Sequence, residues 1–369
     1  MSSTHDVTVF YDDRVLAHQP DVNTAFLPGR LDKRIREILQ GLEVKWSYPE
    51  HPGRLTAIME KLDNQPIPGL RFARGKPATR KQLARVHTTG YLDHIFELRN
   101  QNAWLDVDTT AVSPGSVKAA EVAAGTAVAA VDAVCSGDTE SAFAVVRPPG
   151  HHAEPARARG FCLFNNVAVA AAHAQAHHGC KRVLILDWDA HHGNGTQTMF
   201  WADPDVMFID IHRRAPFYPG SGNLDEIGAG LGEGTTVNIP VPAGTGDVAY
   251  LKALNEIVTP AARAFQPDMI LVSAGFDAHW HDLALNVSYE GFAAMAGIMQ
   301  GLADALCDGR LVYVLEGGYH TESLACGVHA VLEVMAGKTP PQPGVCGVEE
   351  VDAAIAYHRD AFLDPDRPD

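Results

Sequence analysis

Short runs of apolar residues recur along the chain, and most of them end in a polar, glycine-containing stretch. Several runs are almost entirely apolar, which is typical of strands buried on both faces of a parallel sheet. The pattern predicts strands at Val7–Tyr11, Ala142–Arg147, Arg182–Asp187, Val206–His212, Thr236–Val241, Met269–Ser273 and Leu311–Leu315.

Apolar residues between these runs repeat at helical spacing. Helices are predicted over about Gly115–Cys135, Asn165–His178, Asp247–Phe265, Ser288–Leu306 and Thr321–Met335. Alternating strands and helices indicate one α/β sheet with helices on both faces. We find no internal repeat and no long linker, so we expect a single domain over residues 1–369. Residues 12–50 are the least periodic, and the proline-rich segment Thr339–Gly344 is predicted to connect to a short C-terminal helix within an extension at 337–369.

Composition places the chain among globular proteins. Its 369 residues are 46% hydrophobic and 20% charged, so the chain can bury a large hydrophobic core without needing disulfide bonds. The six cysteines are scattered without a CxxC pair, which favours reduced thiols and a cytoplasmic location. The N-terminus has no signal-peptide pattern.

Charge and hydropathy limit the partners. A net charge of −16 disfavours binding to nucleic acid and mildly favours cationic ligands. The most apolar stretch, Ala119–Val134, contains Glu121 and Asp132 and is expected to be a buried helix rather than a membrane span.

Four polar clusters follow predicted strands: RPPGHHA (147–153), DWDAHHGNG (187–195), SAGFDAH (273–279) and EGGYH (316–320). Ligands of open parallel sheets bind beyond the carboxyl ends of the strands, so these clusters are expected to form one site. Each contains glycine, which lets the backbone turn tightly and approach a ligand.

Asp189 and His191 are two residues apart, so their side chains point to the same side of an extended segment. A carboxylate and a neutral imidazole are good zinc ligands, and Asp277 could be the third. Three protein ligands leave a position open, which is the arrangement of catalytic zinc sites. The alternative is a set of hydrogen-bonded polar residues at strand ends. Asp187 alternates with Asp189 and could orient a histidine from behind.

His151 and His152 follow a PPG turn that can direct both rings into one pocket. Near a metal their natural role is proton transfer, and the alternative is two solvated loop histidines. Tyr319 could donate a hydrogen bond to a developing oxyanion, or be a core tyrosine. His177 and His178 end a helix, where positive charge is favoured, and are not predicted to belong to a functional site.

Seven motifs together resemble the zinc-dependent histone deacetylase family, which includes bacterial histone deacetylase-like amidohydrolases and acetylpolyamine amidohydrolases. The resemblance covers about residues 50–336. The motifs are HPGRL (51–55), RVHTTGYL (85–92), RPPGHHA with GFCLFNN (160–166), DWDAHHGNGT, FYPGSG (217–222), SAGFDAH and LEGGY.

The resemblance implies an arginase-like α/β fold with a central, mainly parallel sheet of eight strands. It implies hydrolysis of the N-acetyl amide of a lysine or similar amine, with one zinc ion per chain. The residues that it implicates are Asp189, His191 and Asp277 as zinc ligands, His151 and His152 beside the water that zinc activates, and Tyr319 as oxyanion donor. It also implies a potassium ion bound by Asp187 and neighbouring carbonyl groups.

The resemblance further implies a narrow tunnel that grips an alkyl chain. Its walls would include Gly160, Phe161 and Tyr218, where Tyr218 replaces a more common phenylalanine. Asp108 falls where many relatives carry a rim aspartate that holds the substrate backbone. The segment HDLALNVS (281–288) lacks the proline found in many relatives.

Two residues near the metal motif depart from many relatives. Many relatives carry an aspartate here that partners the second histidine, whereas this sequence has Asn194, which resembles class II-like members of the family. We therefore expect His152 to be the less basic of the pair, with His151 supported by Asp187. Asp210 stands where a small hydroxyl residue often contributes to the potassium site; it could strengthen that site or instead pair with Arg213 or Arg214.

Acetyl-lysine in a peptide or protein and a small acylated amine such as an acetylpolyamine both fit these motifs. A narrow tunnel entrance formed by two paired subunits would favour polyamines as substrates, and this interpretation implies a homo-oligomer. Two remoter alternatives are an arginase-type ureohydrolase with two manganese ions and an inactive module that binds acetylated ligands. The ureohydrolase would need more bridging carboxylates than the sequence offers, and intact His151, His152 and Tyr319 disfavour the inactive module.

Overall fold

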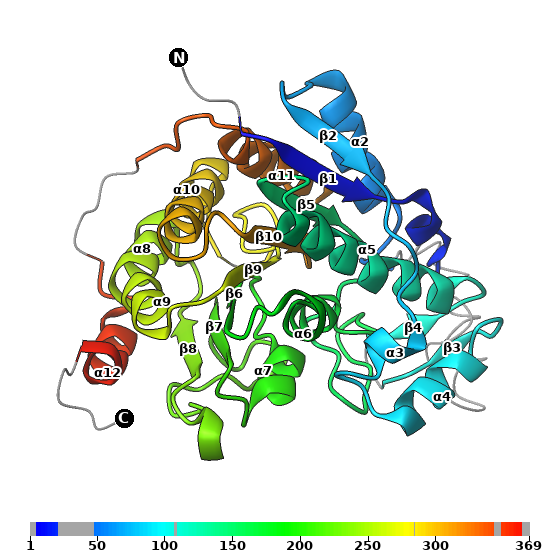
Figure 1. Cartoon of the computed structure of the whole chain (residues 1–369), viewed down its shortest axis with the longest axis horizontal. Helices are drawn as coiled ribbons and strands as arrows, with labels where there is room; N and C mark the ends of the chain where they lie inside the picture. Colours follow the sequence, from blue (N-terminus) through cyan, green and yellow to red (C-terminus); the bar gives the residue numbers. More distant parts are fainter. Residues whose placement is uncertain (1–4, 21–47, 107–108, 284, 343–347, 364–369) are drawn as a thin grey trace, which may run out of the picture.

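The computed structural model describes residues 5–20, 48–106, 109–283, 285–342 and 348–363 (Figure 1). Eight parallel strands form one sheet in the order β2-β1-β5-β10-β9-β6-β7-β8. They are β1 (Val7–Tyr11), β2 (Leu70–Ala73), β5 (Ser141–Val145), β6 (Val183–Asp187), β7 (Val206–Arg213), β8 (Thr236–Val241), β9 (Met269–Ala274) and β10 (Leu311–Leu315). The predicted α/β fold with eight strands is confirmed.

Helices cover both faces of this sheet (Figure 1). One face carries α5 (Ser116–Ser136), α6 (Asn166–His178) and α7 (Asn194–Phe200). The other carries α2 (Gly53–Asn64), α8 (Asp247–Ala253), α9 (Thr259–Phe265), α10 (Tyr289–Leu306), α11 (Thr321–Met335) and α12 (Asp352–Leu363). The smaller elements are η1 (Asp13–Ala17), α3 (Arg80–Leu83), α4 (Thr89–Glu97), η3 (Gly230–Gly232) and a hairpin of β3 (Ala103–Trp104) and β4 (Ala111–Val112).

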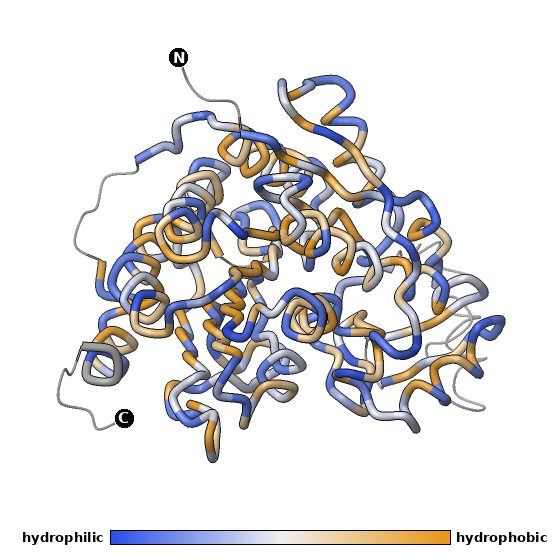
Figure 2. The backbone as a smooth tube through the Cα atoms, in the orientation of Figure 1, coloured by the Kyte–Doolittle hydropathy of each residue, from blue (hydrophilic) through white to orange (hydrophobic). Residues whose placement is uncertain are grey.

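The core lies between the sheet and these helices. All five residues of β6 are buried, and Figure 2 shows the most apolar backbone gathered along the central strands. Among the described residues, α5 is the one helix long and apolar enough to cross a membrane, but 72% of its apolar window is buried. It packs against α6 and β5 as a core helix, as its two acidic residues predicted.

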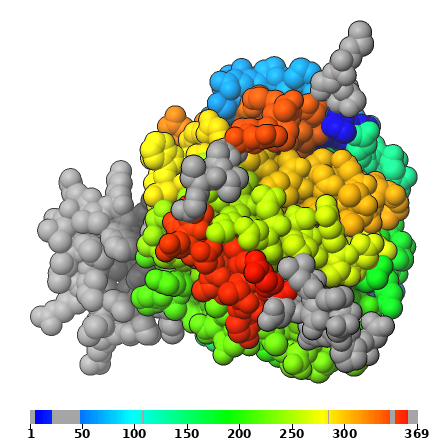
Figure 3. All heavy atoms as spheres, turned by 90° about the vertical axis from the view of Figure 1, so that its left-hand side faces the viewer, coloured from blue at the N-terminus to red at the C-terminus, as the bar shows by residue number. Residues whose placement is uncertain are grey.

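The predicted elements differ from the structure mainly in the first hundred residues, where α2, β2, α3 and α4 were not anticipated. The helix predicted over Asp247–Phe265 is interrupted by a π-helical turn, η4 (Leu254–Val258). The predicted C-terminal helix is α12, which lies against η4, α9 and β8 (Figure 3, red). Asp108, most of the predicted entrance region and the tail after Leu363 lie outside the described residues.

Candidate active site

The site forms where four neighbouring strands end. Strands β5, β10, β9 and β6 are adjacent and parallel, so the loops after them meet at one edge of the sheet. These loops carry the predicted histidine pair, Tyr319, Asp277 and the DWDAHHGNG segment respectively. The ring centres of His151 and His152 are 4.0 Å apart, and those of His152 and His191 are 5.7 Å apart.

Three potential metal ligands converge here: Asp189, His191 and Asp277 have donor atoms that all lie within 4.8 Å of one another. His191 Nδ1 is 3.0 Å from Asp189 Oδ1 and 2.9 Å from Asp277 Oδ2. Burial disfavours charge on His191, but the charges of Asp277 and Asp189 outweigh it and raise the pKa of this histidine to about 9.

The backbone holds both carboxylates in place. Asp189 Oδ2 accepts a hydrogen bond from the Gly317 N–H at 2.8 Å, and Asp277 Oδ1 accepts one from the Ala190 N–H at 2.8 Å. Gly317 is required at its position, because a Cβ there would lie 2.5 Å from a carboxylate oxygen of both aspartates. Each carboxylate therefore keeps its other oxygen turned towards His191.

These residues fit a divalent metal ion. Asp277 Oδ2 and Asp189 Oδ1 both lie against His191 Nδ1, so two fully buried carboxylates share one imidazole, which is costly without a cation to bind them. Two carboxylate oxygens and one imidazole nitrogen form a donor set that suits zinc.

His151 lies against a buried carboxylate. Its Nδ1 is 2.8 Å from Asp187 Oδ2, while Asp187 Oδ1 accepts the Asp189 N–H at 3.0 Å. Burial opposes protonation of His151, but the charges of Asp187 and Asp189 outweigh it and raise the pKa of His151 well above its ordinary value. Of the two adjacent rings, His151 is therefore the one whose charged form its surroundings favour.

His152 has a different partner. Its Nδ1 is 2.8 Å from Asn194 Oδ1, and Asn194 Nδ2 donates to Glu154 Oε1 at 2.8 Å. The contact with Glu154 fixes which end of the amide faces His152, so His152 Nδ1 carries the hydrogen and Nε2 keeps its lone pair. Burial, followed by the charges of His151 and His191, lowers the pKa of His152 well below its ordinary value.

Tyr319 is positioned through its backbone and its ring. Its N–H donates to Asp282 Oδ2 at 2.6 Å, and the Arg54 guanidinium lies 5.1 Å from the ring centre. Burial, together with the charge of Asp277, raises the pKa of Tyr319 well above its ordinary value. The phenol therefore stays protonated and keeps a hydrogen to donate.

The predicted wall residues surround the same histidines. A Cβ on Gly160 would lie 2.1 Å from His152 Cδ2, so only glycine lets the ring approach this backbone. Phe161 adopts a left-handed conformation (φ 68°) and meets the Tyr319 ring at 5.7 Å. Tyr218 meets His152 edge-on at 5.1 Å, and the Arg159 guanidinium lies 5.6 Å from the centre of the Tyr218 ring.

Asp210 and His192 belong to a hydrogen-bonded layer behind the site. Asp210 accepts the Gly193 N–H at 2.7 Å and lies 2.8 Å from His212 Nδ1, so its partners are neither Arg213 nor Arg214. His192, adjacent to His191 in the sequence, lies 2.8 Å from Ser221 Oγ and 2.9 Å from Gln197 Oε1.

Sequence reasoning missed several residues that hold the site together. Glu316 accepts the N–H groups of Gly150 and His151 at 2.6 and 3.1 Å, which fixes the histidine loop. Phe217, not only its neighbour Tyr218, faces the metal ligands, because its ring stacks on His191 at 4.7 Å. A charged residue directly after a buried strand, as Glu316 is, was the available signal, because it must find a partner.

A second group of missed residues is a buried ionic cluster of Glu50, Arg54 and Arg147. Glu50 binds Arg147 through two contacts of 2.9 and 2.8 Å and Arg54 through one of 2.9 Å. Arg54 also donates to the carbonyl groups of Glu316 and Gly318. The cluster thus joins α2 to the loops that carry Tyr319 and the histidine pair. Arg147 and Arg54 stand inside quoted motifs, but their shared partner Glu50 precedes the first motif and lies 97 residues from Arg147.

Comparisons with known proteins agree with this geometry. Residues 48–335 match the histone deacetylase domain. The chain is 40% identical over 314 residues to histone deacetylase 14, chloroplastic, of Arabidopsis thaliana, covering 80% of this chain and 74% of the relative. It is 40% identical over 292 residues to the histone deacetylase-like amidohydrolase of Pseudomonas aeruginosa, covering 78% and 76%.

A probable deacetylase of Archaeoglobus fulgidus is 40% identical over 297 residues, covering 79% of this chain and 82% of the relative. Among solved structures, the HDA15 HD domain superposes with a TM-score of 0.84 at 35% identity, covering 97% of this chain and 96% of that one. The matched segment contains every described residue of the site. The chain therefore belongs to the histone deacetylase family and is a deacetylase.

Proposed function

We propose that the chain hydrolyses the N-acetyl amide of acetyl-lysine, or of a similar acylated amine, to acetate and the free amine. The observation that carries the proposal is the convergence of Asp189, His191 and Asp277 beside two histidines with opposite pKa shifts. Asp189 and Asp277 are both fully buried and share the imidazole of His191, an arrangement that a bound cation would stabilise.

Zinc is the metal that we propose for these three ligands. When bound, zinc polarises the acetyl carbonyl and lowers the pKa of the attacking water. Gly317 and Ala190 orient the two aspartates through their N–H groups, so the protein fixes the ligand geometry before the ion arrives.

The two histidines divide the proton chemistry between them. His152 has a free lone pair on Nε2 and a lowered pKa, so it accepts the proton of the attacking water. His151 is held in its charged form by Asp187, so it supplies positive charge and a proton to the leaving amine. This assignment gives each histidine the role that its own partner favours.

Tyr319 is proposed to donate its phenol hydrogen to the oxyanion that develops on the acetyl oxygen. The Arg54 guanidinium and the Asp282 carboxylate fix its ring and backbone, so the hydroxyl is oriented before the reaction begins. Phe161, which contacts the Tyr319 ring, and Tyr218, which contacts the His152 ring, are proposed to grip the alkyl chain of the amine.

A potassium ion is proposed near Asp187 as a structural ion. Asp187 and Asp210 lie opposite each other on neighbouring strands and are both fully buried, so they concentrate negative charge behind the zinc ligands. A monovalent cation there would lower the cost of burying two carboxylates.

The test is a hydrolysis panel on metal-replete protein. It compares acetyl-lysine peptide, trifluoroacetyl-lysine peptide, acetylputrescine and acetylspermidine, each with and without a chelator. Turnover of the peptides that the chelator abolishes supports an acyl-lysine deacetylase, and faster turnover of the polyamines would make the acetylpolyamine the substrate. No chelator-sensitive turnover on any of the four would overturn the proposal.

A further inference from the structure

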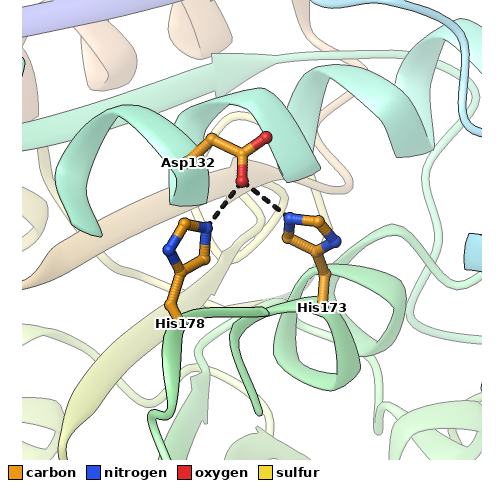
Figure 4. A group of neighbouring side chains, drawn as sticks. All are labelled: Asp132, His173 and His178. Atoms are coloured by element: carbon orange, nitrogen blue, oxygen red, sulfur yellow. Dashed lines mark hydrogen bonds and ion pairs between the residues drawn. The ribbon is translucent and has the colours of Figure 1, made fainter. Parts of the chain in front are cut away.

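A second group of potential metal ligands lies far from the active site. Asp132 on α5 and His173 and His178 on α6 have donor atoms that lie within 4.8 Å of one another (Figure 4). His173 Nε2 and His178 Nε2 are each 2.7 Å from the same carboxylate oxygen, Asp132 Oδ1. Figure 4 shows both rings directing these nitrogens to one point between the helices.

Topology places this group at the opposite edge of the sheet from the active site. Asp132 lies one turn before the end of α5, which leads into the first residue of β5. His178 is the last residue of α6, which leads into β6. The group therefore lies at the amino ends of the strands, whereas Asp189 and Asp277 follow their carboxyl ends.

The three side chains of this group differ in their exposure to solvent. The His173 side chain is only 6% exposed and packs between the helices, while 51% of the Asp132 side chain faces solvent. A metal ion can therefore reach the carboxylate directly from solvent. His178 is intermediate, so the three ligands form a shallow site rather than a closed cage.

We propose that Asp132, His173 and His178 form a second zinc site that joins α5 to α6. Two imidazoles and one carboxylate are a donor set that zinc prefers, with water completing the coordination. Tetrahedral zinc separates its nitrogen and oxygen ligands by about 3.3 Å, so the two contacts to Asp132 need to open by roughly 0.6 Å. The exposed carboxylate can make that movement without disturbing the helices.

Arg85 lowers the affinity of the proposed site for zinc. It lies 2.7 Å from His177 Nε2 and 3.4 Å from His173 Nδ1. A zinc-bound histidine needs its other nitrogen protonated, and arginine only donates, so Arg85 opposes metal binding at His173. Replacing Arg85 with glutamine supplies an acceptor, and the affinity for zinc should then increase.

Nearby thiols are a competing explanation that the experiment must separate. Cys135, near the end of α5, and Cys180, two residues after the end of α6, have sulfur atoms 3.9 Å apart. Thiolates also bind zinc well. A Cys135→Ser variant therefore accompanies the variants of the proposed ligands.

The experiment measures Zn²⁺ bound per chain by equilibrium dialysis and metal analysis, together with the melting temperature and deacetylase activity. We expect two ions for the natural protein and one for both Asp132→Asn and His178→Gln, with deacetylase activity retained. Their affinity for the second ion should fall by roughly 100-fold or more, since loss of even an outer partner of a ligand costs 10–100-fold.

Control variants sharpen the result. Glu140→Gln removes a carboxylate 2.7 Å from His5 at the same edge of the sheet and should leave two ions bound. Zinc should raise the melting temperature of the natural protein further once the first site is full, but not that of Asp132→Asn. Binding of two ions by both Asp132→Asn and His178→Gln, or loss of the second ion in Cys135→Ser alone, would overturn the proposal.

Discussion

At the residue scale, Asn194 decides how the histidine pair divides its work. Its amide oxygen accepts from His152 but carries no charge to stabilise an imidazolium. Asp187 provides such a charge to His151. Two adjacent rings with the same covalent structure therefore have pKa values on opposite sides of the ordinary histidine value.

We predict that Asn194→Asp raises the pKa of His152. The base is active only when neutral, so the acid limb of the pH–rate profile should move to higher pH, and turnover near pH 6 should fall more than turnover near pH 8. Glu154 accepts a hydrogen bond from Asn194, so the variant would place two negatively charged carboxylates beside His152. Adding Glu154→Gln removes one of these charges and should reduce the rise in the pKa of His152. An unchanged acid limb would contradict the proposed role of His152.

We predict that Tyr319→Phe lowers turnover by roughly 100-fold or more, because one oxyanion donor is worth about 3 kcal/mol. The loss should appear in kcat, with little change in KM or in the melting temperature. Tyr91→Phe is a matched control, because this buried phenol donates to the Leu163 carbonyl group and has no proposed part in the reaction. Full activity of Tyr319→Phe would refute its role.

At the element scale, the buried cluster of Glu50, Arg54 and Arg147 ties three segments together. It links α2 to the loops after β5 and β10, and all three side chains are fully buried. Loss of one member leaves the opposite charge unpaired in the core.

Glu50→Gln should therefore destabilise the protein by about 3–5 kcal/mol, as measured by urea unfolding. As a control, replacement of Glu60, an exposed glutamate on α2, with glutamine should change stability by less than about 0.5 kcal/mol. Equal free energies of unfolding for the two variants would show that the buried cluster does not stabilise the folded protein.

Element prediction from the sequence succeeded where burial dominates. Strands such as Leu311–Leu315 and the helix Thr321–Met335 match their predicted bounds, because their apolar residues face the core. Strand β2 was missed because it is an edge strand whose Phe72 is 54% exposed, so it has no apolar run to reveal it.

The candidate site was predictable in part for a similar reason. Residues that follow strands, such as Asp189 and His151, are brought together by the parallel sheet itself. The pairing of Glu50 with Arg147 was not, because the two residues are 97 positions apart and their contact depends on tertiary packing. The same is true of the contact between Asp132 and His178.

At the scale of the whole molecule, buried ionisable groups set the response to pH. Burial lowers the pKa of His18 to about 3. Burial raises the pKa of Glu50, but the charges of Arg147 and Arg54 outweigh it and lower it to about 2. In the unfolded chain these groups have their ordinary pKa values, 6.5 for histidine and 4.5 for glutamate, so the unfolded chain binds protons more readily. Each group therefore contributes stability that is lost as the pH decreases.

We therefore predict that the stability contributed by His18 and Glu50 is lost as pH is lowered from about 6.5 towards 3. A His18→Asn variant removes one of the two groups, so its stability should decline less steeply over the range from 6.5 to 4.5. The measurement is the urea midpoint at a series of pH values. A decline as steep as that of the natural protein would show that His18 stays exposed to protonation in the folded state.

The most direct test of the central claim is turnover of an acetyl-lysine peptide by chelator-stripped protein, measured as zinc is returned in steps. The account predicts no turnover without metal, recovery on addition of zinc, and no recovery in an Asp277→Asn variant at the same zinc concentration. Turnover by the stripped protein, or full recovery by Asp277→Asn, would contradict the assignment of the site.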